Sequence, residues 1–156
     1  MAKVSRDELL ARIGDLVRAS QVSADKFDDV ASDVMGINRT DHRVMDVVER
    51  LGPIPAGKLA EITDLSPAAM TVALDRLESA GLARRVPDPT DRRRVLVEVT
   101  PAAREAAWKI YGPMQEAFIK LMRPYSVADL ELLLGYLEKG EEISAEQLER
   151  VKRMRS

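Results

Sequence analysis

The sequence predicts a mainly helical protein with one small β-hairpin, which is an α+β fold. Aliphatic side chains recur at helical spacing along most of its 156 residues. Only 4% of the residues are aromatic, so the core must be built largely from aliphatic side chains and methionine, a mixture that favours helices. Residues 84–99 differ, because valines there flank a turn rich in proline and charge, as in a hairpin.

The first 37 residues carry two runs of apolar residues at helical spacing, which predict two helices or one helix broken near Gln21. A further helix is expected to begin at Thr40 or Asp41 and to be ended by Gly52 and Pro53. The apolar positions of that helix predict a buried stripe, made of Val44, Met45, Val47, Val48 and Leu51.

Residues 58–80 predict a helix-turn-helix. A short helix around residues 58–63 is followed by a turn at Asp64 and Leu65. A second helix opens at Ser66, a favoured N-cap residue, and Pro67, which suits the first helical position. Gly81 ends this helix. Two short helices joined by a tight turn therefore precede the hairpin directly.

The hairpin concentrates positive charge. Five arginines and two aspartates between Arg84 and Arg94 give +3, whereas the whole chain carries −2. Alternation along a strand places Arg93 on the side of Val95, Val97 and Val99, and it places Arg92 and Arg94 on the other side. Taken alone, such a run is typical of a solvated hairpin tip.

The residues after the hairpin predict long helices that start at Thr100 and Pro101, with interruptions at Gly112–Pro113 and around Pro124 and Tyr125. The segment "VADLELLLGYL" is apolar around much of its helix, which predicts burial against a partner subunit. The bulky aromatic residues of this part are expected to pack in a core or a dimer interface: Trp108, Tyr111 and Phe118.

The order of these elements, together with "LGPIPAGKLAEITDLS", "ALDRLESAGLARR" and "DPTDRRRVLVEVT", resembles the MarR family of bacterial transcription regulators over nearly the whole chain. The resemblance implies a winged helix-turn-helix. Residues 1–37 and 101–156 would form dimerisation helices, and residues 38–100 would form a DNA-binding lobe. A homodimer would then bind a pseudo-palindrome in double-stranded DNA, most simply as a repressor.

The resemblance also assigns roles to residues. The second helix of the motif would enter the major groove, and the hairpin, or wing, would contact the minor groove. One of the wing arginines would enter the minor groove, where negative potential is concentrated, while Asp91 and Arg93 would brace the loop. The predicted DNA-binding residues are Ser66, Pro67, Ala68, Thr71, Val72, Arg76, Arg92, Arg93 and Arg94.

Projection of residues 66–80 at about 100° per residue separates two faces of the reading helix. Methyl groups on the outer face suit thymine methyls, and the Thr71 hydroxyl suits a base edge or a phosphate. The alternative is that Val72 is exposed without a function. The inner face holds Met70, Ala73, Leu74 and Leu77, and the outer face holds Ala68, Thr71, Val72, Asp75 and Ser79.

Two charged residues adjoin the outer face. Arg76, at its flank, is placed for a phosphate or a guanine. A carboxylate at Asp75 would repel phosphates, so we expect it to pair with a nearby arginine, the alternative being acceptance of a bond from a cytosine amino group.

The family resemblance implies a signal as well as a DNA site. Release from DNA in such regulators follows either binding of a small aromatic or phenolic anion or oxidation of a cysteine. This chain has no cysteine, so we expect an anionic effector. Its pocket would combine His42, Arg43, Met35, Met45 and Ile110. For His42, the only histidine, helical spacing by itself favours a solvated pair with Asp46, and the pocket is the alternative.

Other function classes find little support in the sequence. One histidine, no cysteine and no P-loop or HExxH motif argue against an enzyme, a metal site or a cofactor. No signal-like or membrane-spanning apolar run occurs, which predicts a soluble cytoplasmic protein without a membrane partner. The competing hypothesis is a winged-helix module that binds another protein instead of DNA, for which outward arginines on the wing would be unnecessary.

Overall fold

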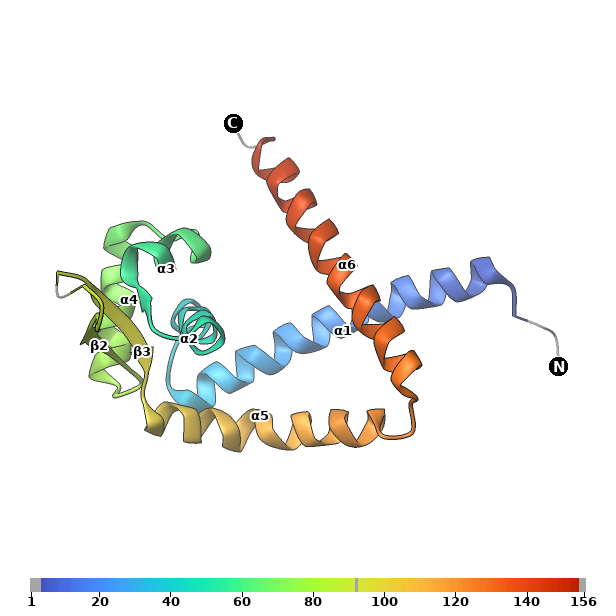
Figure 1. Ribbon diagram of the computed structural model, residues 1–156, viewed down its shortest axis with the longest axis horizontal. Coiled ribbons are helices and arrows are strands. Elements are labelled where there is room, and N and C mark those ends of the chain that lie inside the picture. The colour runs from blue at the N-terminus through green and yellow to red at the C-terminus, as the bar shows by residue number, and fades with distance from the viewer. Residues whose placement is uncertain (1–3, 92, 155–156) are drawn as a thin grey trace. The chain divides into compact units, whose positions relative to one another are not determined.

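The computed structural model describes residues 4–91 and 93–154, so Arg92, a predicted DNA-binding residue, lies outside the described residues. The chain divides into two compact units, Met1–Ile110 and Tyr111–Ser156. The mainly helical α+β fold is confirmed (Figure 1). In chain order the elements are α1 (Arg6–Met35), α2 (Arg39–Leu51), β1 (Ile54–Pro55), α3 (Ala56–Thr63), α4 (Pro67–Ser79), β2 (Ala83–Pro87), β3 (Val95–Val99), α5 (Pro101–Met122) and α6 (Val127–Lys152).

The first helix, α1, is continuous over 30 residues, so the expected break near Gln21 is wrong. A capping box starts it: the Ser5 hydroxyl accepts a bond from the Glu8 N–H, and the Glu8 carboxylate accepts one from the Ser5 N–H. Gly36, with a φ of 68°, ends it. The polar residues around Gln21 leave the helix exposed without interrupting it, because no glycine or proline lies between Gly14 and Gly36.

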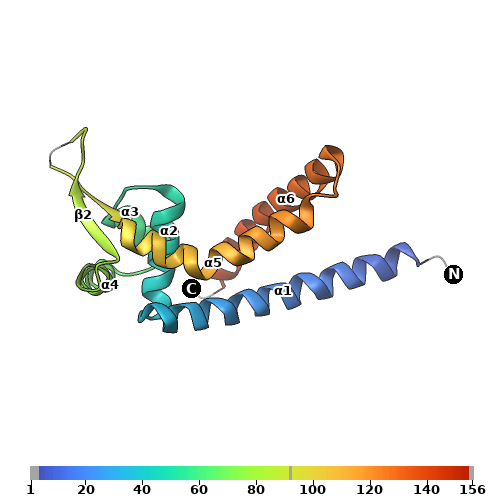
Figure 2. The ribbon, with the colours of Figure 1, turned by 90° about the horizontal axis from the view of Figure 1, so that it is seen from below.

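The expected helix-turn-helix and hairpin are confirmed. They form the lobe, residues 38–100, in which α2, α3 and α4 pack with a small antiparallel sheet (Figure 2). The strand order is β1-β3-β2, with Ile54 opposite Val97 and Ala83 opposite Val99. The sequence did not reveal β1, since two residues are too few to show alternation.

The core of the lobe is aliphatic. The predicted inner face of α4 is confirmed, because Met70, Ala73, Leu74 and Leu77 are each at most 1% exposed. The predicted burial of Leu51 is wrong, since this last residue of α2 is 52% exposed. Val95 is also 52% exposed, because it lies at the outer end of the hairpin. Helix α2 also begins earlier than expected, with Asn38 as its cap.

The helices after the lobe show one confirmed and one wrong boundary. Helix α5 runs through Gly112 and Pro113 without interruption. Proline 113 removes one backbone donor, but both it and Lys109, whose carbonyl loses that donor, are exposed, so water can replace the bond. The expected break near Tyr125 is present, and Ser126 and Asp129 form a capping box that starts α6.

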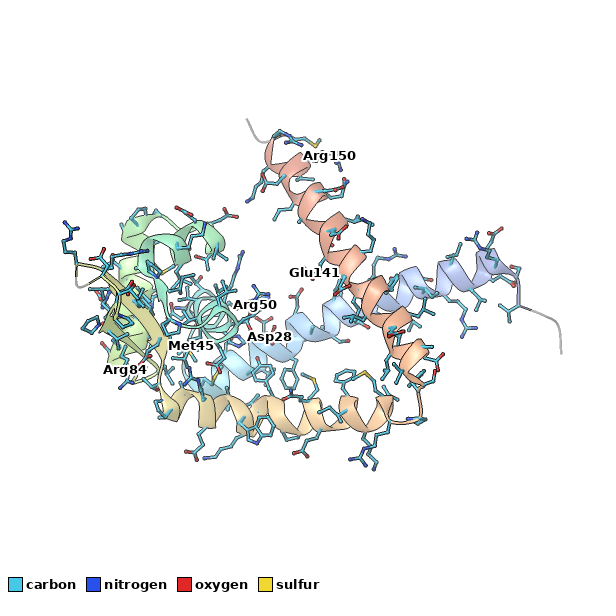
Figure 3. The ribbon with its side chains drawn as sticks, in the orientation of Figure 1. Asp28, Met45, Arg50, Arg84, Glu141 and Arg150 are labelled. Carbon is cyan, nitrogen blue, oxygen red and sulfur yellow. The ribbon has the colours of Figure 1, made fainter. Side chains whose placement is uncertain are left out.

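None of the described residues of α6, Val127–Lys152, is buried. Side chains project from all sides of this helix, Glu141 and Arg150 among them (Figure 3). Within residues 4–91 and 93–154, no helix combines the length and the apolar character required to cross a membrane.

Candidate nucleic-acid interface

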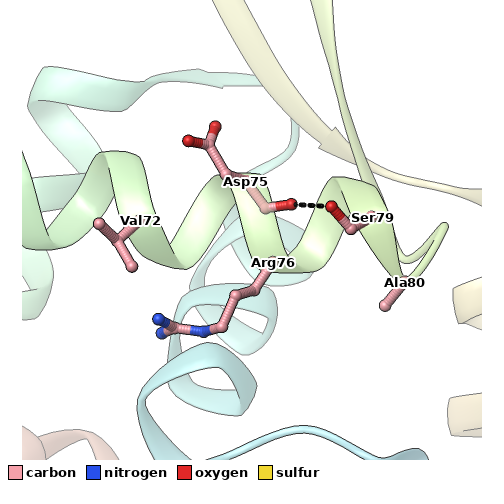
Figure 4. A pocket seen from close by; sticks show the side chains of 5 residues that line it. All are labelled: Val72, Asp75, Arg76, Ser79 and Ala80. Atoms are coloured by element: carbon pink, nitrogen blue, oxygen red, sulfur yellow. Dashed lines mark hydrogen bonds between the residues drawn. The ribbon is translucent and has the colours of Figure 1, made fainter.

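The outer face of α4 is a continuous exposed surface. Ala68, Thr71, Val72, Asp75 and Ser79 are all exposed, as predicted. The face carries a shallow groove lined by Val72, Asp75, Arg76, Ser79 and Ala80 (Figure 4). At its N-terminal end, the Ser66 hydroxyl accepts a bond from the Ala69 N–H at 3.2 Å, and Pro67 is the first helical residue, as the sequence predicts.

The hydroxyl groups of this face are bonded to the helix itself. The Thr71 hydroxyl donates to the Pro67 carbonyl at 3.0 Å, and the Ser79 hydroxyl donates to the Asp75 carbonyl at 2.7 Å (Figure 4). Each oxygen keeps its capacity to accept a bond. The outer face therefore offers methyl groups and acceptors from its small side chains.

Asp75 pairs with an arginine, as expected. Its carboxylate lies 2.9 Å from Arg85 Nη2, and the same guanidinium bonds to the Glu78 carboxylate through Nη1. The Arg85 N–H also donates to Glu78 Oε1 at 2.8 Å. These contacts join strand β2 of the hairpin to α4, so the hairpin and this helix are held to each other.

Arg76 makes a two-pronged contact with a carboxylate from another helix. Its Nε and Nη2 lie 2.8 and 2.6 Å from the two oxygens of Asp41, whose side chain is only 2% exposed. The hydrogen bonds to Asp41 raise the pKa of the Arg76 guanidinium above its usual value. The role of Arg76 on DNA stays a prediction. The sequence predicts Asp41 only as a possible start of α2. Its burial and its contact with α4 could not be predicted from local patterns.

The arginines of the hairpin fall into two groups. At its base, Arg84 pairs with Glu98 at 2.5 Å, and Arg85 pairs with the carboxylates of α4. At its tip, Arg93 and Arg94 are exposed, and the Arg93 side chain is 94% exposed. Carboxylates pair with both arginines of the base, whereas at the tip two exposed arginines accompany the carboxylates of Asp88 and Asp91.

Asp91 and Arg93 lie together, as the resemblance implied. The Arg93 N–H donates to Asp91 Oδ1 at 3.0 Å, while the guanidinium Nε is 3.8 Å from that oxygen. The Asp91 carboxylate therefore fixes mainly the backbone of the loop. The arginine side chain stays directed to solvent.

A buried aspartate that the sequence analysis missed organises the wing loop. The Asp88 carboxylate accepts bonds from the Thr90 hydroxyl at 2.6 Å, the Thr90 N–H at 2.8 Å and the Asp91 N–H at 3.3 Å. Its own N–H donates to the Arg94 carbonyl at 3.0 Å. The bonds from Thr90, and next the bond from Asp91, lower the pKa of Asp88. An aspartate two residues before a threonine in a proline-rich turn is typical of such a motif and could have identified it.

The residues suggested for an effector pocket differ in burial. Met45 belongs to the core of the lobe, so its side chain packs inward. Met35, His42 and Ile110 are half-buried and Arg43 is exposed. His42 Nδ1 lies 3.0 Å from the buried Ser32 hydroxyl of α1. A pair of His42 with Asp46 stays a prediction, as does the pocket.

Two aromatic residues of α5 are exposed. Trp108 and Phe118 are each 55% exposed, so neither packs in a core of its own protomer. Among the residues that the structure describes, no group of three or more histidine or acidic side chains is placed to hold a metal ion.

Comparison with known proteins places the chain in a family. The MarR family model matches residues 37–95. The uncharacterized HTH-type transcriptional regulator YcgE of Bacillus subtilis (strain 168) is 34% identical over 95% of this chain and 96% of its own. A MarR family protein from Bacillus stearothermophilus has the same fold, with a TM-score of 0.65 at 15% identity over 91% of this chain and 99% of that one.

The same fold occurs in a structure that contains nucleic acid. A mutant of MepR from S. aureus, bound to an oligodeoxyribonucleotide, has a TM-score of 0.56 at 16% identity, over 83% of this chain and 96% of that one. The match to YcgE extends over nearly the full length of both proteins and includes the lobe and its flanking helices. The chain therefore belongs to the MarR family of transcription regulators and is not an enzyme.

Proposed function

We propose that this protein is a sequence-specific DNA-binding repressor that binds a pseudo-palindrome as a homodimer and is released by a small-molecule effector. One observation carries the DNA-binding part of the proposal. The exposed face of α4 and the exposed arginines of the wing tip belong to one lobe, and Arg85 fastens them together. Since its ligand is genomic DNA, the proposal places the protein in the cytoplasm.

The two parts of this surface suit different grooves of a DNA duplex. An α-helix enters the major groove, where an exposed face such as that of α4 can reach base edges. Arg93 and Arg94 carry guanidinium groups to a tip that suits the narrower minor groove. Phosphate contacts need only a local positive charge, so the net charge of −2 does not oppose binding.

The dimer is proposed from the exposed apolar face of α6. Leu132 and Leu137 are 75% and 62% exposed, and none of the described residues of this helix is buried. Leucine side chains exposed to water are costly, and a second copy of the chain would cover them. Two-fold symmetry then predicts half-sites whose centres are about 10 bp apart.

Selection of bound sequences from random DNA by the purified protein tests the proposal. We expect an enriched pseudo-palindrome with the spacing given above. Charge reversal at the wing tip, Arg93→Glu with Arg94→Glu, should abolish binding, while Arg84→Ala at the base of the hairpin, where Glu98 balances the arginine, should leave it intact. A protein that enriches no sequence, or that binds as a monomer to a single half-site, would contradict the proposal and favour a protein-binding module.

The release step is proposed on chemical grounds. The sequence contains no cysteine, so peroxide cannot act through a thiol. A ligand can shift the spacing of the two reading helices only if it binds the two conformations of the dimer unequally. His42 and Arg43 would meet its anionic group, with Met35 and Ile110 around an aromatic body.

Parallel titrations of the protein–DNA complex with aromatic carboxylates and with peroxide test this step. We expect release by a carboxylate and no fast response to peroxide. Rapid release by peroxide that a thiol reverses, with no response to any small molecule, would contradict it.

A further inference from the structure

The ion pair between Arg76 and Asp41 joins a half-exposed arginine to a buried aspartate. The Asp41 side chain is 2% exposed, whereas the Arg76 side chain is 46% exposed and lines the groove on the outer face of α4. Asp41 also accepts a bond from the Asn38 side chain at 3.0 Å, at the N-terminus of α2. The carboxylate is thus fixed from behind, and the guanidinium it holds faces the proposed DNA surface.

The geometry of the pair determines which N–H groups of Arg76 remain for a ligand. Asp41 takes the side of the guanidinium formed by Nε and Nη2. A guanidinium has five N–H donors in one plane, so the end formed by Nη1 and the second hydrogen of Nη2 stays available. That end presents two parallel donors, the arrangement that pairs with O6 and N7 of guanine.

The charge of the pair favours a base over a phosphate. A phosphate contact draws its strength from a net positive charge and the release of counterions. The carboxylate of Asp41 balances the charge of Arg76, which weakens that attraction, but it leaves the directional donors intact and fixes their plane. The groove also contains Val72, one helical turn before Arg76, so both side chains face the same stretch of DNA.

We infer that Asp41 is a positioning residue that holds Arg76 as a reader of guanine in each half-site of the operator. This inference rests on the proposed function. It names guanine as one base of the recognition site. It also gives a buried carboxylate on α2, outside the reading helix, a part in sequence specificity.

The test begins with the operator selected by the full-length wild-type protein. Replacing the guanine opposite α4 with 7-deazaguanine removes N7 and keeps Watson–Crick pairing, and inverting the base pair to put cytosine there replaces both acceptors with an amino donor. We expect the base-pair change to weaken binding by about 5- to 150-fold and 7-deazaguanine to account for part of that loss. Arg76→Lys keeps the charge and a partner for Asp41 but lacks the second pair of donors, so its binding should be insensitive to 7-deazaguanine.

Asp41→Asn separates positioning from a purely structural role. Arg76 then keeps its charge but loses the carboxylate that orients it. We expect affinity for unrelated DNA to stay the same or rise while the preference for guanine falls. A structural role alone would instead lower the affinity for all sequences together with the melting temperature. The matched controls are Arg104→Lys and Glu49→Gln, since Arg104 Nε also contacts both oxygens of an α2 carboxylate, at 3.1 and 2.9 Å, away from α4.

Three results would overturn the inference. A selected operator without a guanine opposite α4 would refute it and leave the proposed function standing. A uniform loss of affinity in Arg76→Ala, with a lower salt slope and unchanged base preference, would make Arg76 a phosphate contact. A wild-type protein that enriches no sequence would overturn the inference and the proposed function together.

Discussion

Helices α4 and α6 begin in the same way and end up in opposite surroundings. Each has a serine N-cap, Ser66 with a following proline and Ser126 with a capping box. Yet α4 buries Met70, Ala73, Leu74 and Leu77 completely, while none of the described residues of α6 is buried. Caps and propensity therefore specify that a helix forms, and they say nothing about what covers it.

The lobe and α6 differ in whether their apolar side chains are buried within the chain. The lobe buries an aliphatic core, to which Ala103 of α5 also contributes. The apolar face of α6 gains stability only when a second surface removes it from water.

The largest effect is expected from removing α6. A chain that lacks residues 126–156 should be monomeric by analytical ultracentrifugation and should no longer bind the operator, because both proposed half-sites need linked reading helices. The lobe itself should keep its fold, which circular dichroism would report. A truncated chain that still sediments as a dimer would place the interface elsewhere.

Leucine truncation in the two helices should give effects of different kind. Leu74→Ala, in the core, should lower the free energy of unfolding by about 2–5 kcal/mol. Its cost should not depend on protein concentration. Leu137→Ala, at a position 62% exposed in the protomer, should destabilise the protein by an amount that changes with protein concentration. Denaturation at several concentrations measures both, and a concentration-independent cost for Leu137→Ala would argue against its burial in a dimer.

The charged surface of the lobe should affect DNA binding and leave assembly unchanged. Arg94→Ala should weaken binding to all sequences and lower the slope of log affinity against log salt by about one unit for one lost phosphate contact. The same prediction applies to Arg92→Ala. Arg84→Ala is the control, because Glu98 already balances that arginine. Val72 or Thr71 substitutions should change base preference instead. Equal salt slopes in the wild type and the tip variants would refute the assignment.

The smallest effect is expected at the caps. Ser66→Ala should lower the free energy of unfolding by about 1 kcal/mol, since the Ala69 N–H loses its acceptor. Ser126→Ala should have a similar cost only at concentrations at which the dimer forms. A comparable cost for Ser126→Ala in dilute monomer would show that α6 is stable without a partner.

Local patterns predicted most of the fold and the outer surface of the site. Caps, apolar spacing and turn residues gave α4, the hairpin and the pairing of Asp75 with an arginine. Contacts between distant segments were missed. Asp41 meets Arg76 across 35 positions of sequence, and the two-residue strand β1 exists only because it pairs with β3. The break expected in α1 was wrong because its polar run contains neither glycine nor proline. The break expected in α5 was wrong because Pro113 lies where water can satisfy the backbone.

The buried carboxylate of Asp88 orders the loop of the wing before any DNA is present. Fixing a backbone residue costs about 1–2 kcal/mol of conformational entropy. In residues 88–91 and at Arg94, the bonds to Asp88 and the Arg94 N–H bond to the Asp91 carbonyl impose that order when the protein folds. If the wing contacts DNA as proposed, these described loop residues need no ordering on binding, and we expect association to be limited by diffusion and charge instead of by loop folding.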